Sequence, residues 1–225
     1  MSELQSLMGS LFFQDMEKES AALCAESFRR RKYAEGERIA EEGEDCKCLI
    51  FIASGEAAVQ KYTSDGEFTT VELLQKGDFF GEEVFEKGEA RYRFTLEALS
   101  DVDILSIPGE ILLKDLQRFP KLKENFIRIL LNKEQSRGQH IVLLSQKSVR
   151  QKLACFLLGL QKKQGGGEMV ILPGSREVIS KLLALPRPSF SRELKSMEQA
   201  SLIEVEGRKI RIREQILLEK LVEER

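Results

Sequence analysis

The chain has 225 residues, of which 42% are hydrophobic and 32% are charged, and its formal net charge is −2. This composition excludes a disordered chain, and the length is more typical of two domains than of one. There is no apolar run long enough to span a membrane, and the first 20 residues lack the basic start and apolar stretch of a signal peptide. We therefore expect a cytoplasmic protein with no membrane partner.

The charge is distributed unevenly along the chain. Residues 1–146 carry 19 basic and 27 acidic side chains, a net charge of −8, whereas residues 147–213 carry 14 and 6, a net charge of +8. A basic module can neutralise phosphates and release counterions, which is a main source of affinity for DNA. A solvated basic face with no partner would show the same excess.

The cysteines give little sign of a metal or redox site. There are four, Cys24, Cys46, Cys48 and Cys155, and the chain has a single histidine, His140. A cytosolic chain of this size needs no disulfides, and the spacing of Cys46 and Cys48 differs from that of a zinc-binding pair. We expect reduced structural thiols, no metal and no other cofactor, with redox sensing through Cys46 and Cys48 as the alternative.

The first half of the chain predicts a short helix followed by a small antiparallel β-domain. Apolar spacing indicates a helix over residues 11–31. Beyond it, short β-type runs separated by glycines predict strands at 49–54, 57–62, 68–74, 91–99 and 101–108. Asp65-Gly66 is typical of a hairpin turn between two of these strands. We expect a roll or sandwich that ends at residue 109, so that the first domain covers residues 1–109.

Residues 109–144 show a helical pattern. Apolar and polar residues follow one another there at alternating spacings of four and three: Leu122, Phe126, Ile129, Lys133, Ser136, His140 and Leu143. Such a stripe is typical of a dimerisation helix, although a helix packed on its own domain would show it too. Its polar middle would also suit contacts to a ligand. We assign residues 110–146 to a dimerisation helix.

The last part of the chain, residues 147–225, predicts a winged helix-turn-helix. A helix over 147–163 is followed by a short run at 169–172 and by a second helix that starts at Ser175. Pro186 interrupts the pattern, and a third helix should run from Arg187 to Gln199 with Phe190, Leu194 and Met197 facing inward. Two β-type runs around Glu206-Gly207-Arg208 then predict a hairpin.

The predicted third helix and hairpin carry side chains suited to DNA. They can donate to guanine edges and to phosphates. These candidate DNA-binding residues are Arg187, Ser189, Ser191, Arg192 and Lys195 on the helix, and Arg208 and Lys209 on the hairpin. The alternative is a plain helical hairpin and β-hairpin with solvated basic residues.

The order of parts resembles the catabolite-activator/fumarate-nitrate regulator (Crp/Fnr) family over nearly the whole chain. The resemblance rests on the glycine-spaced phrases YAEGERIAEEGE, LIFIASGEAAV, SDGEFTTVELLQKGDFFGE and ALSDVDILSIP, and on LPRPSFSREL followed by LIEVEGRKIRI. It implies an α+β protein with an N-terminal antiparallel, cyclic-nucleotide-binding-like β-roll, a long dimerisation helix and a C-terminal winged helix-turn-helix. It also implies a homodimer on a near-palindromic double-stranded DNA site, and RNA polymerase as a further partner if the protein is an activator.

The resemblance places the base-contacting positions on Arg187, Pro188, Ser191 and Arg192. Well-known members have a glutamate where this chain has Pro188, and proline offers no side-chain acceptor to cytosine. One base pair of the operator should therefore be read differently, or not at all.

The effector site departs further from the family pattern. Gly81-Glu82 matches the phosphate-binding cassette, in which the glutamate binds a ribose hydroxyl, but Tyr92 and Arg93 stand where Arg-Ser is expected. Arg91 or Arg93 could still supply a cation. On the central helix, Arg137-Gly138 replaces the Thr-Ser of cyclic AMP binders. Candidate effector residues are thus Gly81, Glu82, Arg91, Tyr92, Arg93, Lys133 and Arg137.

We therefore expect a regulator controlled by an unidentified small effector other than cyclic AMP, or by another signal. The alternative is a cyclic-nucleotide-responsive regulator with a non-standard cassette. An enzyme is not expected, because His140 is the only histidine and no catalytic set or phosphate-loop lysine motif accompanies it.

Overall fold

The computed structural model describes residues 11–223. The contacts within the chain divide it into two compact units: the first ends at Ser136, and the second begins at Arg137 and also includes Phe68–Thr70. Among the described helices, none combines the length and the apolar character needed to cross a bilayer. The prediction that the chain has no signal peptide rests partly on residues 1–10. Those residues, and the outer limits of the predicted domains at 1 and 225, lie outside the described residues.

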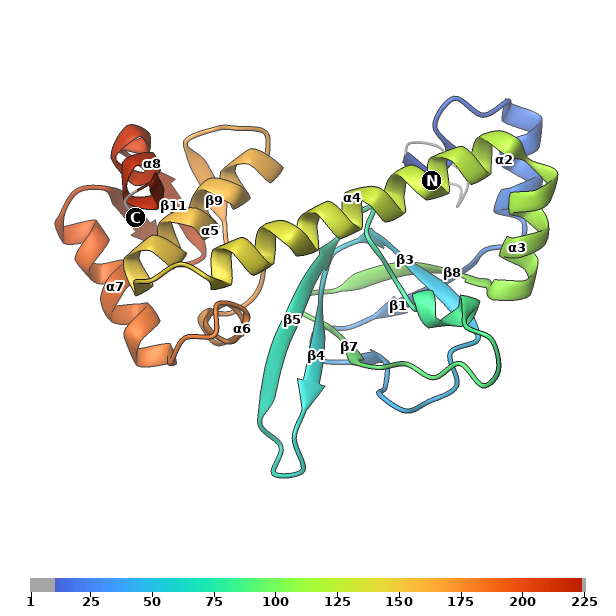
Figure 1. Ribbon diagram of the computed structural model, residues 1–225, viewed down its shortest axis with the longest axis horizontal. Coiled ribbons are helices and arrows are strands. Elements are labelled where there is room, and N and C mark those ends of the chain that lie inside the picture. The colour runs from blue at the N-terminus through green and yellow to red at the C-terminus, as the bar shows by residue number, and fades with distance from the viewer. Residues whose placement is uncertain (1–10, 224–225) are drawn as a thin grey trace. The chain divides into compact units, whose positions relative to one another are not determined.

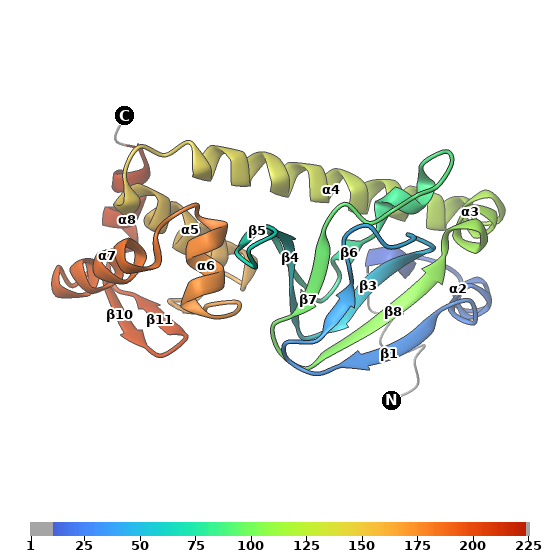
Figure 2. The ribbon, with the colours of Figure 1, turned by 90° about the horizontal axis from the view of Figure 1, so that it is seen from below.

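The first unit is an antiparallel β-roll of two four-stranded sheets (Figures 1 and 2). One sheet has the order β1-β8-β3-β6 and the other the order β2-β7-β4-β5. The strands are β1 (Arg29–Tyr33), β2 (Arg38–Ala40), β3 (Cys48–Ser54), β4 (Glu56–Tyr62), β5 (Phe68–Gln75), β6 (Phe79–Phe80), β7 (Thr95–Ala98) and β8 (Val102–Pro108). The predicted β-roll is confirmed, including the turn at Asp65-Gly66, where Gly66 has a φ of 84° and donates its N–H to the Thr63 carbonyl.

The prediction of one helix over residues 11–31 is wrong. A 3-10 turn, η1 (Leu11–Phe13), and the helix α2 (Lys18–Ala25) occupy its first part, but Arg29–Tyr33 form β1 along β8. β1 lies at the edge of its sheet, and its first four residues are all exposed. An edge strand of this kind has no apolar alternation, so its β-structure left no sign in the sequence pattern.

The strand predicted over 91–99 is wrong in its first half, because β7 begins only at Thr95. Arg91 makes an isolated bridge with Asp45, and the backbone of Tyr92 bonds to Glu44 and Gly43 instead of to a neighbouring strand. These contacts place the Tyr92 side chain inside the roll.

The strand β3 separates two hydrophobic clusters, because successive side chains point to opposite faces. Ile50 and Ile52 face the interior of the roll. Leu49 and Phe51 face a second cluster built with η1, α2, α3 (Gly109–Arg118) and α4 (Pro120–Leu144). Phe12 is the hub of this second cluster, with its ring centroid 4.9 to 6.0 Å from those of Phe13, Phe28, Phe51 and Phe126.

The helical segment predicted after residue 109 is two helices, since Phe119 has an extended conformation and Pro120 begins the second one. The first half of the predicted stripe packs on this protein's own roll: Leu122, Phe126 and Ile129 are buried in the second cluster. Of the two explanations for the stripe, packing on the chain's own domain therefore holds for this half.

The second unit confirms the predicted winged helix-turn-helix. After α5 (Val149–Lys163) come β9 (Met169–Ile171), α6 (Arg176–Leu182), α7 (Arg187–Gln199), β10 (Ile203–Glu206), β11 (Lys209–Ile212) and α8 (Gln215–Glu223). Its three strands form an antiparallel sheet of order β10-β11-β9. A capping box begins α5: the Ser148 hydroxyl accepts from the Gln151 N–H, and the Gln151 side chain accepts from the Ser148 N–H.

Replacing Phe12 by alanine should lower the free energy of unfolding of the first unit by about 3 to 5 kcal/mol, because it empties the centre of five packed rings. Chemical denaturation followed by circular dichroism measures the change. Leu11→Ala is the matched control, because Leu11 is 51% exposed and its loss should cost less than about 0.5 kcal/mol. Equal losses for the two variants would contradict the packing described.

Candidate functional site

The turn between α6 and α7 is fixed by local contacts. The Ser175 hydroxyl accepts a hydrogen bond from the Val178 N–H at 3.3 Å and so caps α6. Ala184 adopts a φ of 51°, which ends α6, and the Leu185 N–H donates to the Ser180 carbonyl at 2.9 Å. α7 then starts with Pro188 in its first turn, where a missing N–H costs no helical hydrogen bond.

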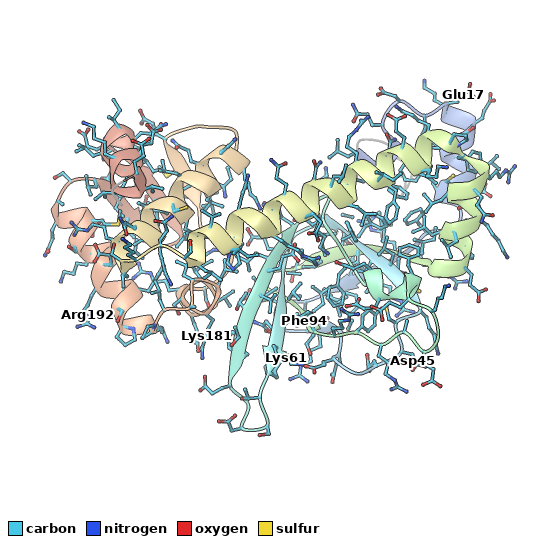
Figure 3. The ribbon with its side chains drawn as sticks, in the orientation of Figure 1. Glu17, Asp45, Lys61, Phe94, Lys181 and Arg192 are labelled. Atoms are coloured by element: carbon cyan, nitrogen blue, oxygen red, sulfur yellow. The ribbon has the colours of Figure 1, made fainter. Side chains whose placement is uncertain are left out.

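The two sides of α7 differ sharply. Phe190, Leu194 and Met197 are buried, as the sequence predicts. Of the candidate DNA-binding residues on α7, Arg187, Arg192 and Lys195 are exposed, and Ser189 and Ser191 are half-buried. Figure 3 labels Arg192 on α7, where its side chain is exposed to solvent. The helix therefore presents donors on one side and anchors itself by the other.

A polar network that the sequence analysis missed holds α7 against α5. The Arg150 guanidinium donates to a Glu193 carboxylate oxygen at 2.5 Å and to the Ser196 hydroxyl at 2.6 Å. At the other end of α7, Glu198 accepts from the Val205 N–H of β10 at 3.0 Å. These pairs are 43, 46 and 7 residues apart, so for the first two no sequence spacing could reveal them.

The candidate cations on α7 make only weak contacts within the protein. Arg187 lies 3.7 Å from Glu177, and both side chains are about half exposed or more. Arg192 donates to the Pro188 carbonyl and to the Ser189 hydroxyl, each at the long distance of 3.4 Å. Exposed contacts of this kind contribute little to stability, so the side chains can turn to a ligand at small cost.

The hairpin of β10 and β11 has a two-residue turn, with Gly207 at a φ of 61°. Arg208 donates from Nε to the Leu172 carbonyl at 2.8 Å, which ties the turn to the segment after β9. Arg213 pairs with Glu204 at 2.7 Å, and Arg211 lies 4.0 Å from the same carboxylate. Lys209, the first residue of β11, is exposed to solvent. Its ammonium makes no ion pair with the described residues.

In the first unit, the candidate effector residues Gly81 and Tyr92 contact each other. Gly81 has a φ of 93°, and a Cβ atom there would lie 2.7 Å from the Cys48 carbonyl oxygen and 3.1 Å from the Tyr92 ring. The Tyr92 ring is buried and stacks on Phe80, with centroids 5.3 Å apart. Gly81 is therefore required for the packing of the roll, whatever else it does.

The two candidate arginines of the roll have partners within it. Arg91 donates to the Gly43 carbonyl at 2.9 Å and lies 3.5 Å from Glu89 and 4.0 Å from Asp45. Arg93 forms an ion pair with Glu86. Both guanidiniums are more than half exposed, so neither forms part of a closed, buried anion site.

The structure brings together two candidates from distant parts of the sequence, Glu82 and Lys133. The Lys133 ammonium lies 2.8 Å from a Glu82 carboxylate oxygen and donates to the Phe79 carbonyl at 2.8 Å. The Lys133 side chain is 9% exposed and that of Glu82 is 27% exposed. Arg137, the last candidate, is exposed one turn further along α4.

Two family models match this chain: a cyclic nucleotide-binding domain over residues 30–119 and a Crp-like helix-turn-helix domain over residues 151–221. The chain is 26% identical over 216 residues to the "Cyclic AMP receptor protein" of Thermus thermophilus, covering 96% of this chain and 98% of the relative. It is 28% identical to "Electron transport regulator A" of Shewanella oneidensis, covering 81% and 74%. The chain belongs to the Crp/Fnr family.

Solved structures agree with this fold. That of FixK2 from Bradyrhizobium japonicum has a TM-score of 0.75 at 24% identity and covers 86% of this chain and 96% of its own. This Crp/Fnr-family protein is thus a DNA-binding transcription regulator with a cyclic-nucleotide-binding-like domain and a helix-turn-helix, as the sequence predicts.

The thiols of this Crp/Fnr-family regulator are held in their neutral form. Burial raises the pKa of Cys46 to about 12 and that of Cys24 to about 11. Burial, with a smaller contribution from Lys163, lowers the pKa of His140. A thiol with a raised pKa reacts slowly at neutral pH, which disfavours redox sensing at Cys46. Within residues 11–223, no three His, Cys, Asp or Glu side chains gather as a metal ion would require.

Gly81→Ala should unfold the first unit more easily than Gly77→Ala. The two glycines have similar positive φ angles, 93° and 95°, but a Cβ at Gly77 would meet no atom within 4 Å. The difference between the variants therefore isolates the clash with Cys48 and Tyr92, which we expect to cost about 1 to 3 kcal/mol. Denaturation with urea measures both variants. If they are equally stable, the close packing at Gly81 is contradicted.

Proposed function

We propose that this protein is a cytoplasmic homodimer that binds a near-palindromic operator, with one α7 helix in each of two successive major grooves. The observation that carries the proposal is the two-sidedness of α7. Its apolar side is buried and braced by Arg150, while its opposite side presents Arg187, Arg192 and Lys195 to solvent. A rigid helix with weakly held cations fits the direct reading of base edges.

Each candidate has a specific role in this proposal. Arg187 and Arg192 contact guanine edges or phosphates, and Ser191 donates to a base edge or a phosphate. Ser189 and Lys195 contact the sugar-phosphate backbone of the DNA, as do Arg208 and Lys209 in the hairpin. Pro188 leaves one base pair without the acceptor that a glutamate would provide, so the operator should differ there from those of well-known relatives.

A second stripe on α4 supports the homodimer. Ile127, Leu131 and Ile141 share a face of this helix at alternating spacings of four and three, with Glu134 and Gly138 between them. These three apolar side chains are 49%, 64% and 68% exposed, and the adjacent Val142 is 58% exposed. Large exposed apolar side chains in a coiled-coil register favour a second copy of the same helix. The dimer contact thus uses a different face from the stripe that starts at Leu122.

The roll supports an effector other than cyclic AMP, or another signal. Arg91 and Arg93 are exposed and paired with acidic groups, and Tyr92 is buried in the packing of the roll. A cyclic phosphate would therefore find no buried cation at those three positions, which disfavours the alternative of a non-standard cyclic nucleotide cassette. We infer no enzymatic activity, and contact with RNA polymerase would follow if the protein activates transcription.

Selection of bound sequences from random duplex DNA should recover a palindrome with the wild-type protein. Arg192→Ala should weaken binding to that palindrome by about tenfold or more and relax the preference at one base pair of each half-site, because a bidentate contact to guanine is worth about 1 to 3 kcal/mol. Gel shifts at several salt concentrations measure the affinity, and repeating the selection with Arg192→Ala measures the preference at that base pair.

Lys220→Ala is the matched control, since it removes one cation from the exposed surface of α8 in the same unit. It should leave the selected sequence unchanged. If Arg192→Ala recovers the same palindrome with the same affinity as Lys220→Ala, α7 is not the reading helix. If no protein enriches any sequence, even after addition of cell extract, the DNA-binding proposal fails.

Leu131→Glu should shift the protein from dimer to monomer. Each copy loses a buried leucine worth about 1.5 kcal/mol or more, so the dimer dissociation constant should rise about a hundredfold. Sedimentation equilibrium measures the constant. Asn132→Asp, at an exposed position outside the stripe on α4, adds the same charge and should have a small effect. A Leu131→Glu protein that dimerises like the wild type would remove α4 from the interface.

A further inference from the structure

An ion pair between Glu82 and Lys133 joins the roll to α4. The Lys133 ammonium donates to Glu82 and to the Phe79 carbonyl, lies 4.0 Å from Glu72, and stands 4.3 Å from the centre of the Phe79 ring. Lys133 therefore has a carbonyl, two carboxylates and an aromatic face around it. A lysine that is 9% exposed is stable only with such compensation.

The ion pair between Glu82 and Lys133 lies where the family resemblance places part of the effector site. Glu82 directly follows Gly81 and is the carboxylate that the family resemblance assigns to a ligand hydroxyl. Here a side chain from the chain's own helix neutralises it. The carboxylates of Glu72 and Glu82 both lie within 4.0 Å of the Lys133 ammonium, so this cation is already occupied by acidic groups of the roll.

Lys133 also lies close to the border between the two units. α4 is continuous from Pro120 to Leu144, and the first unit ends at Ser136, less than one helical turn after Lys133. A contact that fixes α4 on the roll at this point limits the directions in which the helix continues. In a two-state regulator, such a contact shifts the population as a bound effector would.

We propose that Lys133 is a built-in substitute for a small effector: its ammonium joins the roll to α4 from within the chain, so that the protein binds its operator without any ligand. This inference rests on the proposed function. It deepens that function, because it states that the Lys133 side chain takes the place of an effector at Glu82. Regulation then acts on the amount of the protein or through another partner, and Lys133 acts as a positioning residue.

The test compares operator binding by ligand-free, refolded full-length proteins. We expect the wild type to bind with full affinity, and cell extract or added cyclic nucleotides should not improve it. Lys133→Met should weaken binding at least about tenfold, because α4 loses its ion pair with Glu82 and its hydrogen bond to the Phe79 carbonyl. Lys123→Met is the control, since Lys123 is an exposed lysine on the same helix with no ion pair among the described residues, and it should bind like the wild type.

Two further variants separate loss of the anchor from loss of folding. Glu82→Gln breaks the same ion pair from the other side, and the double variant Lys133→Met/Glu82→Gln leaves neither charge behind. The double variant should unfold at the same urea concentration as the wild type, yet bind DNA as weakly as Lys133→Met does. The effects of the single changes on DNA affinity should not add, because both remove one interaction.

Hydrogen exchange supplies a readout that does not depend on DNA. Amides of residues 130–136 should exchange faster in Lys133→Met than in Lys123→Met. The inference is overturned if the wild type binds only with extract or a nucleotide, or if Lys133→Met binds DNA and exchanges like the control. If no variant binds DNA with or without extract, the proposed function fails instead, and the exchange data still show whether Lys133 anchors α4.

Discussion

The packing of the first turns of α4 on the β-roll is the contact on which the rest of the first unit depends. Leu122, Phe126 and Ile129 complete a cluster whose other members come from the N-terminal segment, β3, β6, β8 and α3. Burial of apolar area supplies the free energy, and the crossing aromatic rings fix the position of the helix. Because α4 is continuous, the burial of its first turns also determines which faces of the helix stay exposed up to the end of the first unit at Ser136.

The polar contacts refine this arrangement instead of creating it. Lys133 lies about one helical turn beyond Ile129, and its ammonium contacts Glu82 next to the apolar contacts that the preceding turns make with the roll. In the second unit Arg150 plays a comparable part, since it bonds to Glu193 on α7, while Phe190, Leu194 and Met197 bury the apolar side of that helix. In both places a cation on a helix defines direction, while the buried apolar side chains hold the elements together.

Local signals explain what the sequence could predict. The bounds of α7 followed from Pro186 and from the apolar spacing of Phe190, Leu194 and Met197, and the hairpin followed from Gly207, all within a few residues. Contacts between distant residues left no such sign. The pairing of Glu82 with Lys133, the burial of Tyr92 and the bonds of Arg150 join segments 43 to 54 residues apart or depend on the curvature of the roll. The stripe on α4 was visible, but periodicity alone could not tell its inward face from its outward one, because both carry apolar residues.

The edge strand β1 has a consequence for behaviour at high concentration. The outer side of an edge strand can pair with another strand, and in a flat apolar strand this would invite pairing with the same edge of another molecule. Arg29, Arg30, Arg31 and Lys32 are all exposed along it. Basic side chains along an edge strand disfavour pairing with the same edge of another molecule, so this row protects the roll against edge-to-edge aggregation.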